Sequence, residues 1–192
     1  TEPVKPRKPL ILALSLVLGL FAGIAYAFTR QVFSNAIRNA EEIESQTGLT
    51  VYSTIPLSAT QKTLAQQVTA RAPGVHVLAS SHPSDPSIES LRSLRTSLQF
   101  AMLESPNNRA LITGPAPGVG KSFISSNLAA VLAAGGKRIL FIDADMRKGS
   151  LNQFFGIARA KVLLDVFAGS IAFQTAVPEH VLPAMDFLST VT

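Results

Sequence analysis

Hydrophobic positions are grouped unevenly along the chain, and the longest group lies near its beginning. The run Leu10–Phe28 contains no charged residue. As a helix it would rise about 28 Å, close to the roughly 30 Å hydrocarbon core of a bilayer. Basic residues precede it at Lys5, Arg7 and Lys8, as is typical of a membrane flank. We therefore predict a Pro-rich basic segment over residues 1–9 and a transmembrane helix over residues 10–28.

Two other interpretations of this run were weighed. A buried helix of a soluble protein is usually shorter and carries polar residues on one side. A secretory signal peptide would explain the basic start and the small-x-small sequence Ala25-Tyr26-Ala27, but its apolar part usually has only about 7–15 residues. Charge alone does not fix the orientation, because Arg30 and Arg38 follow the run.

Residues 29–86 are predicted to be a cytoplasmic juxtamembrane region and linker. Residues 29–45 have helical character, and Thr47-Gly48 breaks it. Residues 49–55 alternate like a short strand. Residues 61–86 mix Gln, Thr, Ala, Ser and Pro around one apolar stretch, which is typical of a linker.

Residues 87–192 carry the pattern of an α/β domain. Apolar residues recur every three or four positions over Ile88–Leu103, which predicts a helix that Ser87 can cap. A short apolar strand (109–113), a Gly/Pro loop, an apolar helix (122–134) and a second strand (137–143) then form a β-loop-α-β unit. Such a unit implies a parallel sheet covered by helices.

The pattern after this unit is weaker. Residues 151–155 and 162–168 are predicted to form short helices, and residues 186–190 a third strand. The fold class is therefore α/β, a truncated parallel sheet that follows one transmembrane helix. The loop between its first strand and helix reads GPAPGVGKS and ends in Gly-Lys-Ser, which makes the predicted sheet one of the P-loop NTPase type. Because the chain begins with Thr1 and not with Met, we expect it to be an excised piece.

Composition excludes several classes of function. Hydrophobic residues make up 47% and charged residues 15%, and the net charge is +5. The basic residues are scattered except beside the apolar run, so we expect a lipid partner and no nucleic acid. The chain has no cysteine, which excludes disulfides and cysteine nucleophiles. Its three histidines are isolated and form no metal-ligand pattern: His76, His82 and His180.

The Gly/Pro loop is the strongest candidate for chemistry. Backbone amides in a Gly-rich turn at a helix N-terminus bind anions, and a lysine that closes the loop adds a positive charge. The first glycine of the usual G-x-x-x-x-G-K-S/T pattern falls on Pro115 here, with Gly114 one residue early. The predicted phosphate-binding residues are Pro117, Gly118, Val119, Gly120, Lys121 and Ser122.

Two carboxylates follow the second strand of the unit. In the sequence IDADMR, Asp143 and Asp145 lie at the carboxyl end of that strand, where ligands of open α/β sheets bind. Two carboxylates that face a phosphate cradle imply a cation between them. We therefore predict that Ser122, Asp143 and Asp145 hold Mg²⁺.

An apolar strand followed by DxDxR, downstream of this P-loop, resembles the second Walker motif of bacterial tyrosine kinases. These kinases act with, or are fused to, the polysaccharide co-polymerases that set chain length in capsule and exopolysaccharide export. The resemblance extends over EPVKPRKP, YSTIP, ESLRSLRTSL and DVFAGS. It implies ATP and Mg²⁺ as cofactors, with Lys121, Asp143 and Asp145 as catalytic residues.

The resemblance also implies partners and a location. Glu89, Arg92 and Arg95 match the family's E-x-x-R-x-x-R, which is associated with subunit contacts; a solvated helix face would give the same pattern. It implies a homo-oligomer that phosphorylates in trans on tyrosines near the C-terminus, polysaccharide export machinery, and a cognate tyrosine phosphatase. The implied location is the bacterial inner membrane, with the P-loop domain in the cytoplasm.

Two departures from the family pattern limit the resemblance. No third nucleotide motif follows Asp145, and the only tyrosines are Tyr26 and Tyr52. We therefore expect the chain to be the middle of a longer protein and to be inactive alone as an autokinase. One alternative is a partitioning or septum-placing ATPase switch, whose signature lysine would fall on Ala116. Another is a non-enzymatic co-polymerase that binds nucleotide only to assemble.

Overall fold

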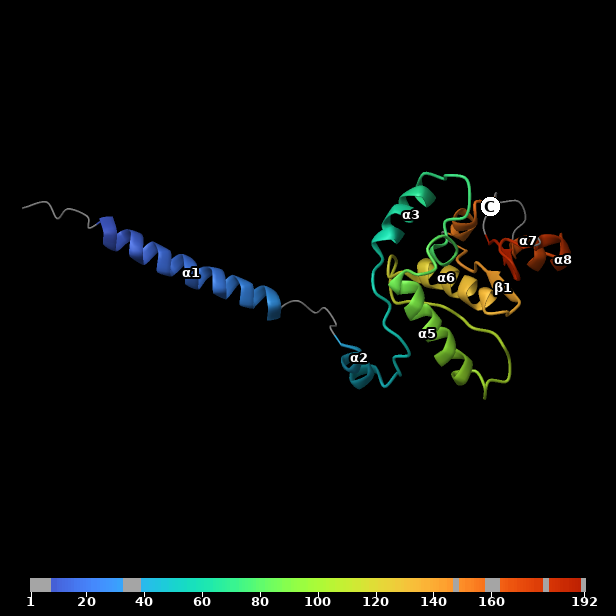
Figure 1. Cartoon of the computed structure of the whole chain (residues 1–192), viewed down its shortest axis with the longest axis horizontal. Coiled ribbons are helices and arrows are strands. Elements are labelled where there is room, and N and C mark those ends of the chain that lie inside the picture. Colours follow the sequence, from blue (N-terminus) through green and yellow to red (C-terminus); the bar gives the residue numbers. More distant parts are fainter. Residues whose placement is uncertain (1–7, 33–38, 147–148, 158–162, 178–179, 191–192) are drawn as a thin grey trace, which may run out of the picture. The chain divides into compact units, whose positions relative to one another are not determined.

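The computed structural model describes residues 8–32, 39–146, 149–157, 163–177 and 180–190. The chain divides into two units, Thr1–Val51 and Tyr52–Thr192, each of which is described by itself (Figure 1).

The first unit contains two helices. Helix α1 (Lys8–Val32) includes the whole apolar run, and by length and composition it can cross a membrane. Helix α2 (Ala40–Thr47) ends at Gly48, whose positive φ of 69° stops the helix in a left-handed cap. Most of the basic segment before α1 and Arg38 lie outside the described residues.

The second unit is built around helix α6 (Lys121–Ala134), which has layers on two sides. One side packs against helix α5 (Pro86–Ala101) and short helix α4 (Leu78–Ser81), with α3 (Ala59–Thr69) beside them. The other side carries the small residues Ala129, Ala130 and Ala133 and faces the sheet. Small side chains let the strands approach α6 closely, so this helix is the centre of the fold.

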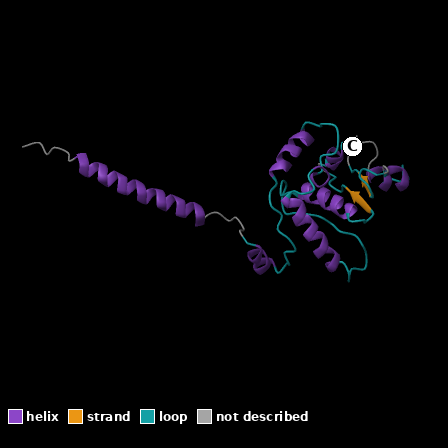
Figure 2. Cartoon of the chain, viewed as in Figure 1, coloured by secondary structure: helices purple, strands orange, loops and turns teal. Residues whose placement is uncertain are grey.

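The described sheet has two strands, which are parallel. Strand β1 (Ile139–Ile142) pairs with β2 (Met185–Leu188) in register from Ile139 opposite Met185 to Ile142 opposite Leu188 (Figure 2). This pairing confirms the predicted parallel sheet, and β2 begins one residue before the predicted strand. The 3₁₀ helix η1 (Leu151–Phe155) and the helices α7 (Leu163–Phe167) and α8 (Phe173–Ala176) lie between the strands in sequence.

Only one face of β1 is covered in the described part of the chain. Ile139 and Phe141 pack in the core with Phe155 and Phe187, whereas alternate residues of the strand point away from α6. Leu140 and Ile142 are about two-fifths exposed as a result.

Two predicted strands are absent. Residues 49–55 and 109–113 are extended but make no β-ladder within the described ranges. In the first segment, burial alternates because Ser53 and Ile55 face the folded unit, and the Ser53 hydroxyl donates to Ser90 O of α5 at 3.4 Å. Exposed and partly buried residues do alternate here as predicted, but the side that is covered packs against a helix and not against another strand. In the second segment Leu111 is 87% exposed.

The interpretation of residues 61–86 as mainly a linker is wrong. The segment forms most of α3 and all of α4, and all of its Leu and Val residues except Val75 are buried. Leu64 and Leu78 pack against α5 and α6, and Val77 packs against the sheet side of the core. The polar composition of the segment hid these contacts because each helix buries only one narrow stripe.

Helix α5 begins earlier than predicted, and its cap is Asp85, not Ser87. The Asp85 carboxylate accepts from Ser87 N at 2.9 Å and from Ser87 Oγ at 2.5 Å. Its other oxygen accepts from Ser58 Oγ at 2.7 Å, and Ser58 caps α3 by accepting from Gln61 N. A single carboxylate therefore joins the N-termini of α3 and α5.

Candidate functional site

The Gly/Pro loop leads directly into α6, as the sequence predicted. Gly120 is the N-cap residue with φ of 95°, and Gly118 has φ of 78°. Both conformations lie in the left-handed region that favours glycine. Residues 115–119 are exposed, and no acceptor in the described ranges bonds the amides of Ala116 and Gly118–Gly120. Free amides at the positive end of a helix dipole are an arrangement that favours anions, so phosphate binding by this loop stays a prediction.

Gly114 has a steric role that explains its unusual position. A Cβ on this residue would lie 2.9 Å from Val119 Cγ2 and 3.1 Å from Lys121 Cγ. The loop therefore folds back over residue 114, and a larger residue there would force the Val119 and Lys121 side chains to move.

Lys121 and Ser122 are the first two residues of α6. The Lys121 ammonium donates to Ala116 O at 2.9 Å, so its charge is held over the loop. The Ser122 side chain is exposed, while its carbonyl accepts from Ser126 Oγ at 2.7 Å. The Lys121 side chain thus lies over the loop, and contact of Ser122 with a phosphate-bound cation stays a prediction.

The predicted carboxylates lie at the end of β1. Asp143 is 3% exposed, and its two oxygens accept from Asp145 N at 3.1 Å and from Leu151 N at 3.3 Å. Asp145 is exposed. No hydrogen bond of the described residues joins either carboxylate to Ser122, so the structure places the two halves of the predicted site on adjacent elements without direct contact.

Gly149 and Thr190 belong to the same place, and sequence reasoning missed both. A Cβ on Gly149 would lie 2.6 Å from Thr190 Cγ2 and 3.0 Å from Asp143 Oδ2. Thr190 is fully buried, and its Oγ1 has no hydrogen-bond partner among the described residues. An unsatisfied buried hydroxyl costs about 1–3 kcal/mol. In the sequence, Gly149 directly after DADMRK is a weak signal of the site, whereas a lone threonine such as Thr190 gives no signal.

The donor set fits a hydrated Mg²⁺. Serine and threonine hydroxyls and carboxylates are hard oxygen ligands, and an orphaned buried hydroxyl lies beside them. The described residues contain no group of three or more His, Asp or Glu side chains that could hold a metal. This is compatible with Mg²⁺, which usually takes one or two carboxylates and completes its shell with water and substrate phosphates.

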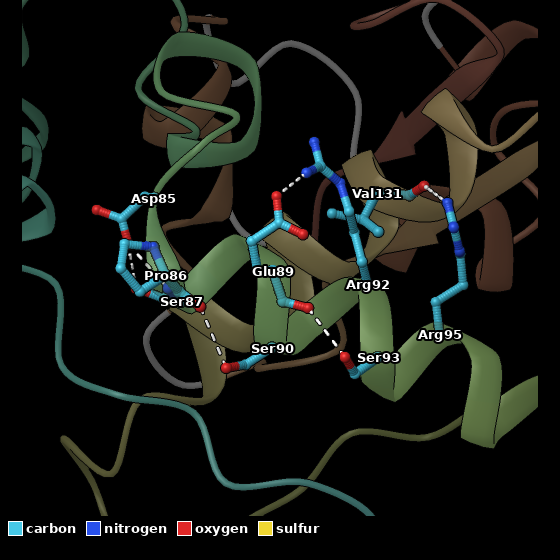
Figure 3. Close-up of polar contacts among 9 residues, drawn as sticks. All are labelled: Asp85, Pro86, Ser87, Glu89, Ser90, Arg92, Ser93, Arg95 and Val131. Carbon is cyan, nitrogen blue, oxygen red and sulfur yellow. Dashed lines mark hydrogen bonds and ion pairs between the residues drawn. The ribbon is translucent and has the colours of Figure 1, made fainter.

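The three charged residues of α5 divide into two sets (Figure 3). Glu89 and Arg92 form an exposed ion pair with each other. Arg95 instead turns to α6, where its Nη1 donates to Val131 O at 3.4 Å beside Gly135. Arg95 thus departs from the alternative of a solvated helix face, because its guanidinium lies at the carbonyl end of α6. Subunit contacts through Glu89, Arg92 and Arg95 stay a prediction.

Fold and site together define a nucleotide-binding domain of the P-loop class, and the comparisons agree. Residues 110–163 match the family "CobQ/CobB/MinD/ParA nucleotide binding domain", and residues 1–32 match "G-rich domain on putative tyrosine kinase". The chain resembles the BceF tyrosine kinase domain, with a TM-score of 0.72 and 41% identity over 80% of this chain and 62% of that one. The kinase domain of Escherichia coli tyrosine kinase ETK gives a TM-score of 0.71 and 35% identity over 80% of this chain and 60% of that one.

The chain is homologous to bacterial tyrosine-protein kinases. It is 53% identical to "Putative tyrosine-protein kinase EpsB" of Ralstonia solanacearum over 98% of this chain and 25% of the relative. It is 41% identical to tyrosine-protein kinase wzc of Salmonella typhimurium over 88% of this chain and 24% of that protein. The chain thus spans about a quarter of the length of these relatives.

Proposed function

We propose that this chain is the membrane-anchored, phosphate-binding part of an ATP-dependent protein-tyrosine autokinase that regulates exopolysaccharide or capsule polymerisation and export. The observation that carries the proposal is the loop before α6, with its positive-φ glycines, unbonded amides and Lys121 charge. The homology of the chain to tyrosine-protein kinases supports kinase activity over the other functions that P-loop proteins have.

Each residue of the site has a role in this proposal. The amides of residues 118–120 bind the β- and γ-phosphates of ATP, and Lys121 neutralises part of their charge. Ser122 and the carboxylates Asp143 and Asp145 hold Mg²⁺, which when bound neutralises charge that develops on the transferring phosphoryl group. The buried position of Asp143 fixes its orientation, whereas the exposed Asp145 can meet the substrate.

The reaction is the transfer of the γ-phosphoryl group to a tyrosine of a neighbouring subunit. A bond forms between the phenolic oxygen and the γ-phosphorus, and the bond from that phosphorus to the bridging oxygen of ADP breaks. The phenolic proton leaves to a carboxylate or to water. The protein contributes positioning and charge stabilisation more than covalent chemistry.

The proposal includes partners and a location. Helix α1 anchors the protein in the inner membrane, with the P-loop unit in the cytoplasm, where ATP is available. A homo-oligomer provides the acceptor in trans, and Glu89, Arg92 and Arg95 contribute to its contacts. The polysaccharide export machinery and a cognate phosphatase are further partners.

Two alternatives use the same site. A partitioning-type ATPase switch would share the matched nucleotide-binding family. The position of that class's signature lysine is occupied here by Ala116, whose carbonyl accepts from Lys121 of the same loop. A non-enzymatic co-polymerase would bind ATP without turnover.

One experiment separates these functions. In the full-length protein in nanodiscs, Lys121→Met should weaken Mg-ATP binding at least tenfold, or about 1.4 kcal/mol, and abolish phosphotyrosine formation. Lys137→Met, at an exposed residue just after α6, is the matched control and should change neither. Unchanged binding in Lys121→Met would overturn the P-loop assignment. Hydrolysis without phosphotyrosine in the wild type would favour the switch, and binding without turnover would favour the co-polymerase.

A further inference from the structure

Thr190 keeps a hydroxyl that its own packing does not use. The residue follows β2, is fully buried, and has no hydrogen-bond partner for Oγ1 in the ranges that the structure describes. Its methyl group is in close contact with Gly149. Valine has nearly the same shape and would make the same contact. The hydroxyl is therefore the one property of Thr190 that the fold leaves unexplained.

The position of Thr190 points to the nucleotide site. Asp143 N donates to Leu188 O at 3.0 Å, so β1 and β2 end together and release Asp143 and Thr190 at the same carboxyl edge of the sheet. Thr190, Asp143 and Asp145 pack closely around Gly149 at this edge, because a Cβ on Gly149 would lie 2.6 Å from Thr190 Cγ2 and 3.0 Å from both Asp143 Oδ2 and Asp145 O. The carboxyl edge of a parallel sheet is where ligands of this fold class bind.

We infer that Thr190 is a positioning residue of the Mg²⁺ site: its hydroxyl hydrogen-bonds a water that bound Mg²⁺ carries beside Asp143. This inference rests on the proposed function. Mg²⁺ keeps several of its waters when it binds proteins, and those waters need partners. A threonine hydroxyl both donates and accepts, and a fully buried one stays in a fixed place. Outer-shell partners of this kind tune metal affinity without touching the metal.

The inference gives opposite expectations for folding and binding. Removing an unsatisfied hydroxyl without changing shape should leave the nucleotide-free protein as stable as before or more stable. The same change should remove a partner of the metal-bound water. We therefore expect Thr190→Val to have an unchanged or higher melting temperature without nucleotide and a weaker response to Mg²⁺. Thr190→Ser keeps the hydroxyl and is the matched control.

The experiment uses the full-length protein and the probe ADP, titrated by calorimetry with Mg²⁺ and then with EDTA. Thr190→Val should lose about tenfold in Mg-ADP affinity. ADP affinity in EDTA should be unchanged in this variant. Thr190→Ser should keep most of the increase in ADP affinity that Mg²⁺ gives the wild type. This pattern separates a hydroxyl partner of the metal from general damage to the phosphate loop.

Three results would overturn the inference. Wild-type Mg-ADP affinity in Thr190→Val would mean that the hydroxyl has no role in the metal site. Equal losses in the Val and Ser variants would assign the effect to packing. A lower melting temperature of nucleotide-free Thr190→Val would show that the hydroxyl already has a partner. If instead the wild type itself fails to bind ADP with or without Mg²⁺, the proposed function fails, and the inference fails with it.

Discussion

At the scale of single residues, the candidate site combines side chains of very different burial. Asp143 is buried and bonded to two backbone amides, whereas Asp145 and Ser122 are exposed. A buried carboxylate that accepts from two amides keeps its direction without a ligand. The sequence pairs the two aspartates as equals, but the structure gives them different surroundings.

This difference leads to a prediction for the two carboxylates. In the full-length protein, Asp145→Asn should lower the autophosphorylation rate by at least a hundredfold with little change in melting temperature, because phosphoryl transfer depends on charge and positioning. Asp143→Asn should lower the rate similarly and also destabilise the fold, because an amide nitrogen would face backbone donors. Rates by phosphotyrosine blotting and melting by calorimetry test both. Wild-type rates in both variants would mean that the aspartates merely end a strand.

At the scale of elements, α6 is held at both of its ends. Its N-terminus carries the phosphate loop, and its C-terminus receives Arg95 from α5. Gly135 permits this contact, since a Cβ there would lie 2.8 Å from Arg95 Nη1. Asn127 adds a further tie, because its buried side chain accepts from Ala79 N and donates to Phe123 O.

Mutations of the charged residues of α5 should therefore have different effects, depending on whether they remove the Glu89–Arg92 pair or Arg95. Glu89→Ala with Arg92→Ala should change stability by less than about 0.5 kcal/mol, because the pair is exposed, but should reduce self-association. Arg95→Met should cost about 1 kcal/mol. Gly135→Ala should cost a similar amount in the wild type and much less in the Arg95→Met background. Urea unfolding and light scattering measure the two effects; an unaltered oligomer in the double variant would leave Glu89 and Arg92 as a solvated pair.

Elements in which apolar residues recur regularly over many positions were predictable from the sequence. Elements with only a few apolar residues, spread among polar ones, were not. The extents of α5, α6 and β1 follow from repeated apolar positions, with errors of only a few residues. Alternation over residues 49–55 reported only that one side is covered, and could not say by what. Residues 61–86 bury too few apolar side chains to stand out. Thr190 was invisible because its environment is made by three distant segments.

At the scale of the whole molecule, the two units need different surroundings. Helix α1 exposes large apolar side chains along its length, as a helix for a bilayer does. The second unit buries its apolar residues around α6 and depends on polar contacts to fix its helices. Its response to acid depends in part on Asp85.

Asp85 gives a pH prediction for the second unit. The hydrogen bond from the Ser87 hydroxyl, followed by those from Ser58 and Ser87 N, holds the pKa of Asp85 below its usual 3.8, against the opposing effect of burial. A lowered pKa means that this stabilisation is complete above that value and is lost as the pH falls through the folded-state pKa. Asp85→Asn removes the charge, so the wild type's advantage in melting temperature should hold from pH 7 to 5 and shrink below about pH 4.

Further variants around the Asp85 carboxylate serve as controls for this pH prediction. Ser87→Ala removes the largest cause of the lowered pKa, so the loss of stability should begin at a higher pH than in the wild type. At pH 7, Asp85→Ala should cost about 1 kcal/mol through the lost cap. Parallel melting curves of wild type and Asp85→Asn down to pH 3 would contradict the assignment.

The shared cap at Asp85 also constrains how this sequence can drift. Ser58, Asp85 and Ser87 satisfy one another, and both serines are at least 95% buried. A chance replacement of Asp85 leaves the Ser87 hydroxyl without its partner, so Ser87 could then be exchanged for alanine at little further loss, whereas Ser58 still caps α3 through Gln61 N. The fitness effect of a change at Ser87 thus depends on whether Asp85 was lost first. Homologues that have lost the aspartate should often carry alanine or glycine in place of Ser87 but keep a capping residue in place of Ser58, whereas those that keep the aspartate should keep both serines.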